Sequence, residues 1–266
     1  MSFRIYIPTL DRIGKSKQVT LNEFLAKSPY KPVLVCPIRE VKYHKKYYPN
    51  VIGCSQNQGT AKKGAGSTRQ WILENSKAST IFICDDDLYF QRRIDSETTK
   101  LQPAMSLKDL IQDCIKVVNS GYIHGGISPR QGNNYCKKAH QDNTRNCGFH
   151  FLNREEVIKS GARYDQLEVM EDFYFTLSLL TAGYPNRVLY SYSFNQRDQR
   201  GGSIGGCNTY RTSDLQSSSA EKLASRFPEF VKVIEKETKG WSIAAGKRKD
   251  VRIQWKKAFE SSKSPH

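Results

Sequence analysis

Three consecutive carboxylates directly follow the apolar residues 81–84 of this sequence: Asp85, Asp86 and Asp87. In an extended chain, successive side chains point to opposite faces, so we expect Asp85 and Asp87 to converge while Asp86 faces away. Carboxylate oxygens suit Mg²⁺ or Mn²⁺, which usually keep several waters and bridge to the phosphates of a substrate. The pattern therefore predicts a metal site with Asp85 and Asp87 as ligands, although a strand that ends in a solvated acidic loop would show the same residues.

A second pair of acids, Glu171 and Asp172, stands about 85 residues further along the chain, where an apolar helical pattern begins. Phe173, Leu177 and Leu180 recur on one stripe of that pattern. Acids in a first helical turn are stabilised by the exposed amides and by the positive end of the helix dipole, which alone explains many such pairs. Their combination with the earlier acids favours a functional site with two acidic components.

The first half of the chain alternates strand and helix signals around these acids. Strands are predicted at 3–8, 31–36, 51–54 and 81–84, and helices at 20–27 and near Ser67, where Ser67 and Gln70 form a capping box. Strands that alternate with helices predict a mainly parallel sheet with helices on both faces, the Rossmann-like α/β class. Ligands of such sheets bind beyond the carboxyl ends of the strands, where the three acids stand.

The second half of the chain is more mixed. Helices are predicted at 106–119, 154–160 and 169–182, strands at 125–128 and 149–153, a polar loop over the cleft at 130–145, and a mobile Gly-rich loop at 197–212. From Ser217 onward the pattern is basic and helical, with Trp241 and Trp255 as anchors. These boundaries predict a catalytic domain at 1–216 and a basic helical C-terminal extension at 217–266 that packs on it.

The chain carries a net charge of +16, from 42 Lys and Arg residues against 26 Asp and Glu residues. Such a field attracts phosphate backbones, so a polyanionic partner is expected; added solubility is the alternative. No segment approaches the roughly 20 apolar residues of a membrane span, and the first residues lack the layout of a secretory signal. We therefore expect no membrane partner and a cytoplasmic location. The seven cysteines form no C-x-x-C pair, which indicates reduced side chains.

The order of strand, Asp-Asp-Asp turn and Glu-Asp helix start resembles the glycosyltransferases of the A-type fold, in which a single α/β domain binds a nucleotide sugar. Several segments look like those of the phage DNA-base enzymes known as TET-associated glycosyltransferases. These segments are the Ile-Pro-Thr start at 7–9 and residues 68–71, 85–88, 128–134, 170–173, 205–206 and 210–212. The resemblance covers roughly residues 3 to 232 and implies a single-domain, Rossmann-like A-type glycosyltransferase fold.

The resemblance also implies a reaction. Such transferases need a divalent ion, Mn²⁺ or Mg²⁺, to neutralise the leaving nucleoside diphosphate of a donor such as a UDP-sugar, and Asp87 with Asp85 or Asp86 would hold it. An inverting enzyme also needs a base that takes the proton of the acceptor hydroxyl as the new C–O bond forms. Asp172 is the candidate for that catalytic base, with Glu171 as the second choice. A retaining reaction would need no such base.

Other residues are expected to bind the donor or the acceptor. They are Thr9, Asp11 and Arg12 after the first strand, Arg69 near a helix start, Asp85 and Asp86 in the acidic turn, Arg130, Asn133 and Asn134 in the polar loop, and Arg211. The guanidinium group of Arg donates paired hydrogen bonds to phosphates, and the side-chain amide of Asn forms hydrogen bonds with hydroxyl groups or base edges. Gly201-Gly202 and Gly205-Gly206 would supply a flexible lid. Each of these features also has a purely structural explanation. The residues after the first strand could form a helix-capping turn, Arg69 could pair with an acid at the surface, and the polar and Gly-rich segments could be ordinary loops.

The expected function is metal-dependent transfer of a sugar onto the hydroxymethyl group of a modified pyrimidine in DNA, such as 5-hydroxymethylcytosine in a bacteriophage genome, within the host bacterial cytoplasm. The basic surface would hold the DNA backbone, and the target base would leave the stack. The alternatives are a glycosyltransferase that acts on a protein or glycan, and a Mg²⁺-dependent nuclease that binds nucleic acid. A dehydrogenase is disfavoured, because Gly64-Ala65-Gly66 lacks the third glycine of the dinucleotide fingerprint.

Overall fold

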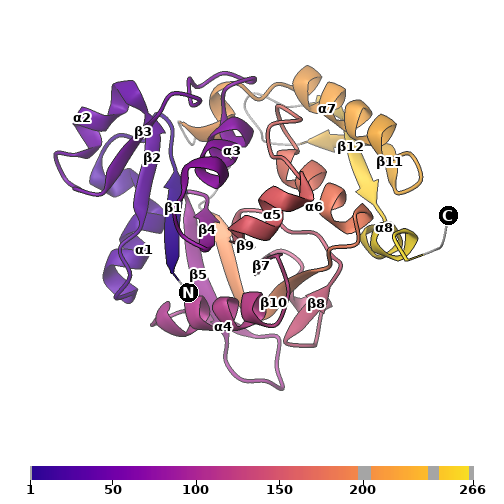
Figure 1. Ribbon diagram of the computed structural model, residues 1–266, viewed down its shortest axis with the longest axis horizontal. Helices are drawn as coiled ribbons and strands as arrows, with labels where there is room; N and C mark the ends of the chain where they lie inside the picture. The colour runs from indigo at the N-terminus through magenta and orange to yellow at the C-terminus, as the bar shows by residue number, and fades with distance from the viewer. Residues whose placement is uncertain (1, 197–204, 239–245, 264–266) are drawn as a thin grey trace.

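The computed structural model describes residues 2–196, 205–238 and 246–263. Its main feature is a ten-stranded sheet with helices on both faces, and the C-terminal elements lie on the side away from β2 and β3 (Figure 1). In spatial order the strands are β3 (Val51–Cys54), β2 (Val33–Pro37), β1 (Phe3–Pro8), β4 (Thr80–Cys84), β9 (Phe149–Asn153), β7 (His124–Pro129), β10 (Asn186–Gln196), β5 (Leu88–Arg93) and β6 (Leu101–Pro103), with β8 (His140–Asp142) paired to β10. The helices around the sheet are α1 (Val19–Lys27), α2 (Val41–His44), α3 (Ala65–Asn75), α4 (Lys108–Asn119), α5 (Arg154–Ser160) and α6 (Glu171–Thr181).

The two halves of the sheet are paired differently. β3, β2, β1 and β4 are parallel, as the alternating first half of the sequence predicts. β9 runs antiparallel to β4 and β7, and β10 is parallel to β7 but antiparallel to β5 and β8. The α/β class is therefore confirmed, but the sheet is mixed and not mainly parallel. The difference arises in the second half, where the sequence prediction contains no strand at 186–196.

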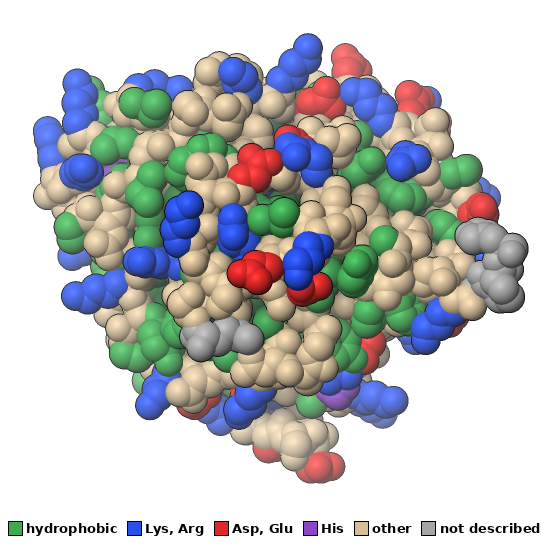
Figure 2. Space-filling model, in the orientation of Figure 1, with side chains coloured by type: hydrophobic (Ala, Val, Ile, Leu, Met, Phe, Trp, Pro, Cys, Tyr) green, Lys and Arg blue, Asp and Glu red, His purple; other side chains and the backbone are tan. Residues whose placement is uncertain are grey.

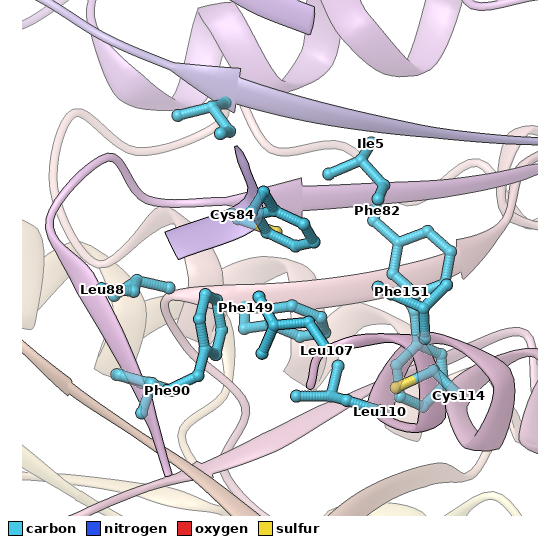
Figure 3. Close-up of a cluster of buried hydrophobic side chains, with 14 of the residues drawn as sticks. Ile5, Phe82, Cys84, Leu88, Phe90, Leu107, Leu110, Cys114, Phe149 and Phe151 are labelled. Atoms are coloured by element: carbon cyan, nitrogen blue, oxygen red, sulfur yellow. The ribbon is translucent and has the colours of Figure 1, made fainter. Parts of the chain in front are cut away.

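β4 is buried on both of its faces. Phe82 and Cys84 belong to a cluster that includes side chains of α1 and α4, and Figure 3 shows the aromatic rings of this cluster packed together. Ile81 and Ile83 belong to the opposite cluster, with side chains of α3, α5 and α6. Alternate residues of a strand point to opposite faces, so a strand between two helical layers must be apolar throughout. This packing fixes the position of the end of β4, and the three acids come directly after it.

The predicted helices are present, with shifted ends. α1, α4, α5 and α6 lie where helical spacing predicts them. The capping box is wrong, because α3 begins at Ala65 with Gly64 at its N-cap, and the Ser67 hydroxyl donates to the carbonyl oxygens of Gln56 and Gly64. No helix within the described ranges has the length and apolar character needed to cross a bilayer.

The C-terminal elements are α7 (Ser213–Arg226), β11 (Val231–Thr238), β12 (Gly246–Ile253) and α8 (Trp255–Ser261). β11 and β12 form an antiparallel hairpin, so the prediction of a helical extension is wrong for these residues. A third apolar cluster joins the extension to α6, with Leu177 and Leu180 from the helix and Leu223 and Val251 from the extension. Trp255 packs edge-on against Phe173 of α6. The domain boundary at 216 stays a prediction.

Both segments that the sequence predicts to be loops contain short regular elements in the structure. The polar segment 130–145 is only partly a loop, because it contains β8 and a short 3-10 helix, Asn133–Tyr135. The Gly-rich segment contains a 3-10 helix, Gly206–Thr209, in its described part. Residues 197–204, with Gly201 and Gly202 of the predicted lid, and Trp241 lie outside the described residues.

Candidate active site

The three carboxylates stand in the turn between β4 and β5, and not on an extended strand. The first turn of α1 holds this turn: the Thr20 hydroxyl donates to the carbonyl oxygen of Asp85 at 2.5 Å and accepts from the amide of Leu88 at 2.8 Å. On the other side, the Asp85 amide donates to the carbonyl oxygen of Gly148 at 2.8 Å. The expected alternation of side chains does not apply here, so local bonds decide the direction of each carboxylate.

Asp86 turns back toward the end of β1. Its two oxygens accept from the Thr9 hydroxyl at 2.6 Å and from the Arg12 guanidinium at 2.7 Å. Gln18 holds both partners, because its side-chain amide donates to the Thr9 hydroxyl at 3.0 Å and to the carbonyl oxygen of Arg12 at 2.8 Å. Burial raises the pKa of Asp86 to about 7, while Arg12 opposes this shift and Asp87 adds to it.

Asp87 shares the Arg12 guanidinium with Asp86. One Asp87 oxygen lies 3.3 Å from Nη2 of Arg12, and the other accepts from the Gln196 side chain at 3.3 Å. Burial raises the pKa of Asp87, with Arg12 opposing the shift. Asp11 points elsewhere: it has a φ of 54°, its carboxylate lies 3.4 Å from Arg39, and it does not line the cavity described below.

Asp85 and Glu171 meet at one arginine. Arg69 of α3 donates through Nη2 to Asp85 at 2.5 Å and through Nη1 to Glu171, and the Arg69 and Glu171 side chains are only 6% and 7% exposed. α3 can approach α6 this closely because Gly66 has no side chain. A Cβ at Gly66 would lie 2.7 Å from the carbonyl oxygen of Tyr164 and 3.2 Å from the Cβ of Glu171. Arg69 therefore joins the acidic turn to the start of α6.

Asp172 has a different environment from Glu171. One of its carboxylate oxygens accepts from the amide of Phe173 at 3.0 Å, and the residue lines the cavity. Burial raises the pKa of Asp172 to about 6, to which Glu171 adds, while Arg69 and Arg145 oppose the shift. A cavity carboxylate with a pKa close to neutrality has the properties of a general base.

These side chains line one cavity of about 660 Å³. Of the predicted site residues, it includes Thr9, Arg12, Arg69, Asp85, Asp86, Asp87, Glu171, Asp172 and Arg211. Another wall comes from the C-terminal extension, with Lys236, Arg248, Asp250 and Trp255. Figure 2 shows acidic side chains beside Lys and Arg side chains near the middle of one face of the molecule. The structure thus brings the two acidic components together and adds residues from the far end of the chain.

The three predicted site residues of the polar loop, Arg130, Asn133 and Asn134, are not brought to this cavity. Asn133 is 1% exposed, and its amide nitrogen donates to the carbonyl oxygen of Tyr190 at 3.0 Å while its side-chain oxygen accepts from Arg93 at 3.2 Å. The amide that we expect to contact sugar or acceptor therefore holds the loop against β10 instead. Arg130 and Asn134 are exposed and do not line the cavity.

The segment 205–211 is attached to the β1 end and to the start of α3. The amide of Gly206 donates to the carbonyl oxygen of Leu10 at 2.9 Å, and the Tyr210 hydroxyl accepts from the amide of Ala65 at 3.1 Å. These bonds place Arg211 in the cavity lining. A contact between Arg211 and a phosphate stays a prediction.

Asp85 and Asp87 suit a divalent cation. Both line the cavity, and the burial that raises the pKa of Asp87 would be offset by a nearby positive charge. Mg²⁺ and Mn²⁺ are commonly held by one or two carboxylates together with waters and substrate phosphates, so two protein ligands suffice. Among the described residues, no three His, Cys, Asp or Glu side chains form a ready-made metal site.

Several cavity residues are not among the predicted site residues: Arg145, Cys147, Gln196, Lys236, Arg248 and Asp250. Gln196 ends β10, where alternating Val188, Tyr190, Tyr192 and Phe194 are a strand signal that could have located it. Arg145 and the hairpin residues carry no motif of their own. Only their packing beside α6 brings them to the site.

Comparisons with known proteins agree with this architecture. The profile of the TET-Associated Glycosyltransferase family matches residues 3–203. No curated protein matches the chain in sequence. The S. aureus TarS fragment 1–349 in complex with UDP-GlcNAc is similar in structure, with a TM-score of 0.55 and 14% identity over 86% of this chain and 67% of that chain.

Two further TarS structures from S. aureus are also similar. The fragment 1–349 in complex with UDP has a TM-score of 0.52 and 12% identity, over 86% of this chain and 66% of that chain. A longer TarS structure has a TM-score of 0.53 and 11% identity, over 86% of this chain but only 40% of that chain. At these identities the likeness concerns the fold, which is that of the A-type glycosyltransferases, as the sequence predicts.

Proposed function

Because the chain belongs to the TET-associated glycosyltransferase family, we propose that this glycosyltransferase moves a sugar from a nucleotide-sugar donor onto the hydroxymethyl group of a modified pyrimidine in DNA. The observation that carries the proposal is the shared cavity of the acidic turn and Asp172. One component can receive a donor with its metal ion, and the other can activate an acceptor hydroxyl.

Asp172 is the proposed catalytic base. The buried Arg69 guanidinium donates a hydrogen bond to the Glu171 carboxylate, whereas the Asp172 carboxylate accepts one from a backbone amide. With a pKa of about 6, Asp172 is ionised at neutral pH and still basic enough to accept a proton. A hydroxymethyl group has a pKa far above neutrality, so Asp172 takes its proton only as the C–O bond to the sugar forms.

Asp85 and Asp87 are the proposed ligands of a Mn²⁺ or Mg²⁺ ion. Such an ion neutralises negative charge that develops on the leaving nucleoside diphosphate. Asp86 has a positioning task, since it anchors Thr9 and Arg12 at the end of β1 beside the cavity. Arg12 and Arg69 balance the carboxylates in the cavity, and we assign them to the diphosphate of a donor such as a UDP-sugar.

The net charge of +16 supports a nucleic-acid acceptor, because an excess of cations attracts the phosphate backbone. Lys and Arg side chains are distributed over the face in Figure 2 and are not confined to one part of it. A base inside a duplex cannot reach the residues that line a cavity, so the target pyrimidine would leave the stack. The proposal places the enzyme in the bacterial cytoplasm, where phage DNA is modified.

The test is sugar transfer to defined DNA. The protein is incubated with Mn²⁺, with a panel of nucleotide sugars and with duplexes that contain 5-hydroxymethylcytosine, 5-hydroxymethyluracil or only ordinary bases. Mass spectrometry of the digested nucleosides then detects a hexose or pentose increment. Asp172→Asn should abolish transfer, while Asp214→Asn should retain it, because Asp214 is also a first-turn acid but is exposed and does not line the cavity.

Three outcomes would count against the proposal. Sugar on a protein or glycan but on no DNA would assign the enzyme to another acceptor. Metal-dependent cutting of ordinary DNA without sugar transfer would indicate a nuclease. Full transfer by Asp172→Asn would remove the proposed base.

A further inference from the structure

A cluster of cations lies in the cavity wall that the C-terminal hairpin supplies. Lys236 of β11 stands directly opposite Arg248 of β12, so both side chains leave the hairpin on the same face. Asp250, two residues after Arg248, shares this face. Its carboxylate lies 2.9 Å from Nζ of Lys236 and 3.6 Å from Nη2 of Arg248. All three residues line the cavity.

Arg145 approaches the same place from the loop before β9. Its guanidinium lies over the Phe173 ring, 4.9 Å from the centroid, and the residue is exposed to the cavity. The pKa of Arg145 is raised, first by the Cys147 side chain and then by Asp172 and Asp250, with burial opposing. Arg145 therefore lies over Phe173 in the same cavity as Asp172 and the hairpin cluster.

The backbone around Arg145 is held firmly. The next residue, Asn146, is 1% exposed, and its side-chain Nδ2 donates to the carbonyl oxygen of Gly125 at 2.8 Å and lies 2.9 Å from Nε2 of His124. Gly126 must lack a side chain for this arrangement, because a Cβ there would lie 2.0 Å from the Asn146 oxygen. A side chain that starts from an anchored backbone loses less entropy when it binds a ligand.

We propose that Arg145, Lys236 and Arg248 form a subsite that binds a phosphodiester group of the nucleic-acid acceptor, next to Asp172. The inference rests on the proposed function and names the residues that hold its acceptor. Guanidinium forks and an ammonium group are the natural partners of a phosphate. Asp250 keeps the hairpin cations in place before the acceptor arrives and competes with the phosphate for them.

The position of the cluster favours the acceptor over the donor. The acidic turn, Arg12 and Arg69 come from the ends of β1 and β4 and from α3, whereas the cation cluster comes from the hairpin and the loop before β9. The hairpin also lies after residue 203, where the match to the family profile ends. The competing assignment is that the cluster binds a phosphate of the donor. The experiment must distinguish binding of the acceptor from binding of the donor.

The lead variant is Lys236→Gln, with Lys247→Gln as its matched control. Lys236 is half-exposed and its loss leaves Arg248 to pair with Asp250, so the hairpin should fold. Lys247 is an exposed neighbour on the other face of the same hairpin and does not line the cavity. Each variant removes one positive charge, so a difference between them reports position and not net charge.

Fluorescence anisotropy would measure the affinity for a labelled duplex with one 5-hydroxymethylcytosine between 50 and 200 mM salt, roughly the range in which phosphate contacts change affinity steeply. Loss of one phosphate contact lowers the slope of log affinity against log salt by roughly 0.9 for a duplex. We expect this loss for Lys236→Gln and for Arg145→Gln, and no change of slope for Lys247→Gln.

Asp250→Asn should change the DNA affinity and its salt dependence in the opposite direction. Asparagine keeps a side-chain oxygen for the Val251 amide but removes the carboxylate that competes with phosphate. Tighter binding and a steeper salt dependence are therefore expected. A merely structural role of Asp250 would weaken binding or leave it unchanged, which would overturn the proposal.

The outcomes separate this inference from the proposed function. If the wild type glycosylates DNA and Lys236→Gln binds DNA with the slope of Lys247→Gln, the subsite is wrong and the function stands. If the wild type transfers no sugar to DNA, the function is wrong, and the salt slopes alone decide whether the cluster binds phosphodiesters. A loss of nucleotide-sugar affinity in Lys236→Gln as large as its loss of DNA affinity would assign the cluster to the donor and overturn the proposal.

Discussion

Arg69 and Glu171, 102 positions apart in the chain, form a buried ion pair at the cavity, and the second guanidinium nitrogen of Arg69 binds Asp85. One side chain of α3 thus couples the acidic turn after β4 to the first residue of α6. The donor side and the acceptor side of the proposed reaction therefore depend on a common support.

Replacement of Arg69 by Met should destabilise the protein strongly. The change leaves two carboxylates without their cation, one of them 7% exposed, and breaking a buried pair in this way costs about 3–5 kcal/mol. Urea denaturation would measure the free energy of unfolding. Arg163→Met is the control, since Arg163 pairs with Asp165 and Glu74 at the surface and such pairs contribute about 1 kcal/mol or less. Equal losses in the two variants would show that the buried pair adds no stability.

Replacement of Gly66 by Ala should separate α3 from α6. The new Cβ would meet the carbonyl oxygen of Tyr164 at 2.7 Å, and overpacking of this kind costs about 1–3 kcal/mol. Arg69 would then lose its position against Glu171, so sugar transfer should fall as well. Thermal unfolding and the transfer assay would be compared with Ser67→Ala, one residue further along the same helix. A Gly66→Ala protein with wild-type stability and activity would contradict the packing argument.

The rate of transfer should rise with pH through a midpoint near 6. Asp172 acts only in its ionised form, and its pKa is raised to about 6, so kcat/KM should fall below that pH and level off above it. Arg145 opposes the upward shift of the Asp172 pKa, so Arg145→Gln should move the midpoint to higher pH. Steady-state kinetics between pH 5 and 8 would show this. An unmoved midpoint in Arg145→Gln would mean that the titrating group is not Asp172.

Asp86 should make the folded state less stable as pH rises from about 4 to about 7. Its pKa is raised from 3.8 to about 7 in the folded protein, so the folded state binds the proton more tightly than the unfolded chain does. The stability from this group is therefore complete below pH 3.8 and is lost as pH rises through about 7, by at most about 1.4 kcal/mol per pH unit.

Asp86→Asn isolates this contribution. Other groups titrate in the same range, among them His124, whose pKa burial lowers to about 3. Groups that do not interact with Asp86, such as His124, should contribute equally to both proteins, so the difference in unfolding free energy between variant and wild type should grow in favour of the variant between pH 4 and 7. A difference that does not depend on pH would show that Asp86 is ionised throughout.

Donor binding should require the carboxylate of Asp87. Isothermal titration of a nucleotide sugar should show tight binding with Mn²⁺, weak binding after chelation, and recovery when Mn²⁺ returns. Asp87→Asn should lose the effect of Mn²⁺, while Asp95→Asn, an acid in an exposed turn, should keep it. Metal-independent binding by the wild type would exclude the proposed role of Asp85 and Asp87.

The sequence by itself determined the elements whose residues form local patterns. The apolar run at 81–84 requires burial on both faces, and β4 has it. Strands β3 and β9 and helix α5 begin and end where their patterns predict, because periodicity and helix caps act between near neighbours. The acids after β4 and at the start of α6 were identifiable for the same reason.

Only the tertiary structure decided which side chains meet. The acids after β4 lie in a turn, so bonds to Thr20, Thr9 and Arg12 set their directions, and no rule of strand alternation could supply them. β11 begins and β12 ends with alternating apolar and charged residues, as in Val231-Lys232-Val233, but the runs of charges beside them suit an exposed helix equally well. The hairpin forms because Val231 and Val251 bury against the α6 cluster, and that contact brings Lys236 and Arg248 to the cavity. Such contacts depend on packing between distant segments, which local sequence patterns do not record.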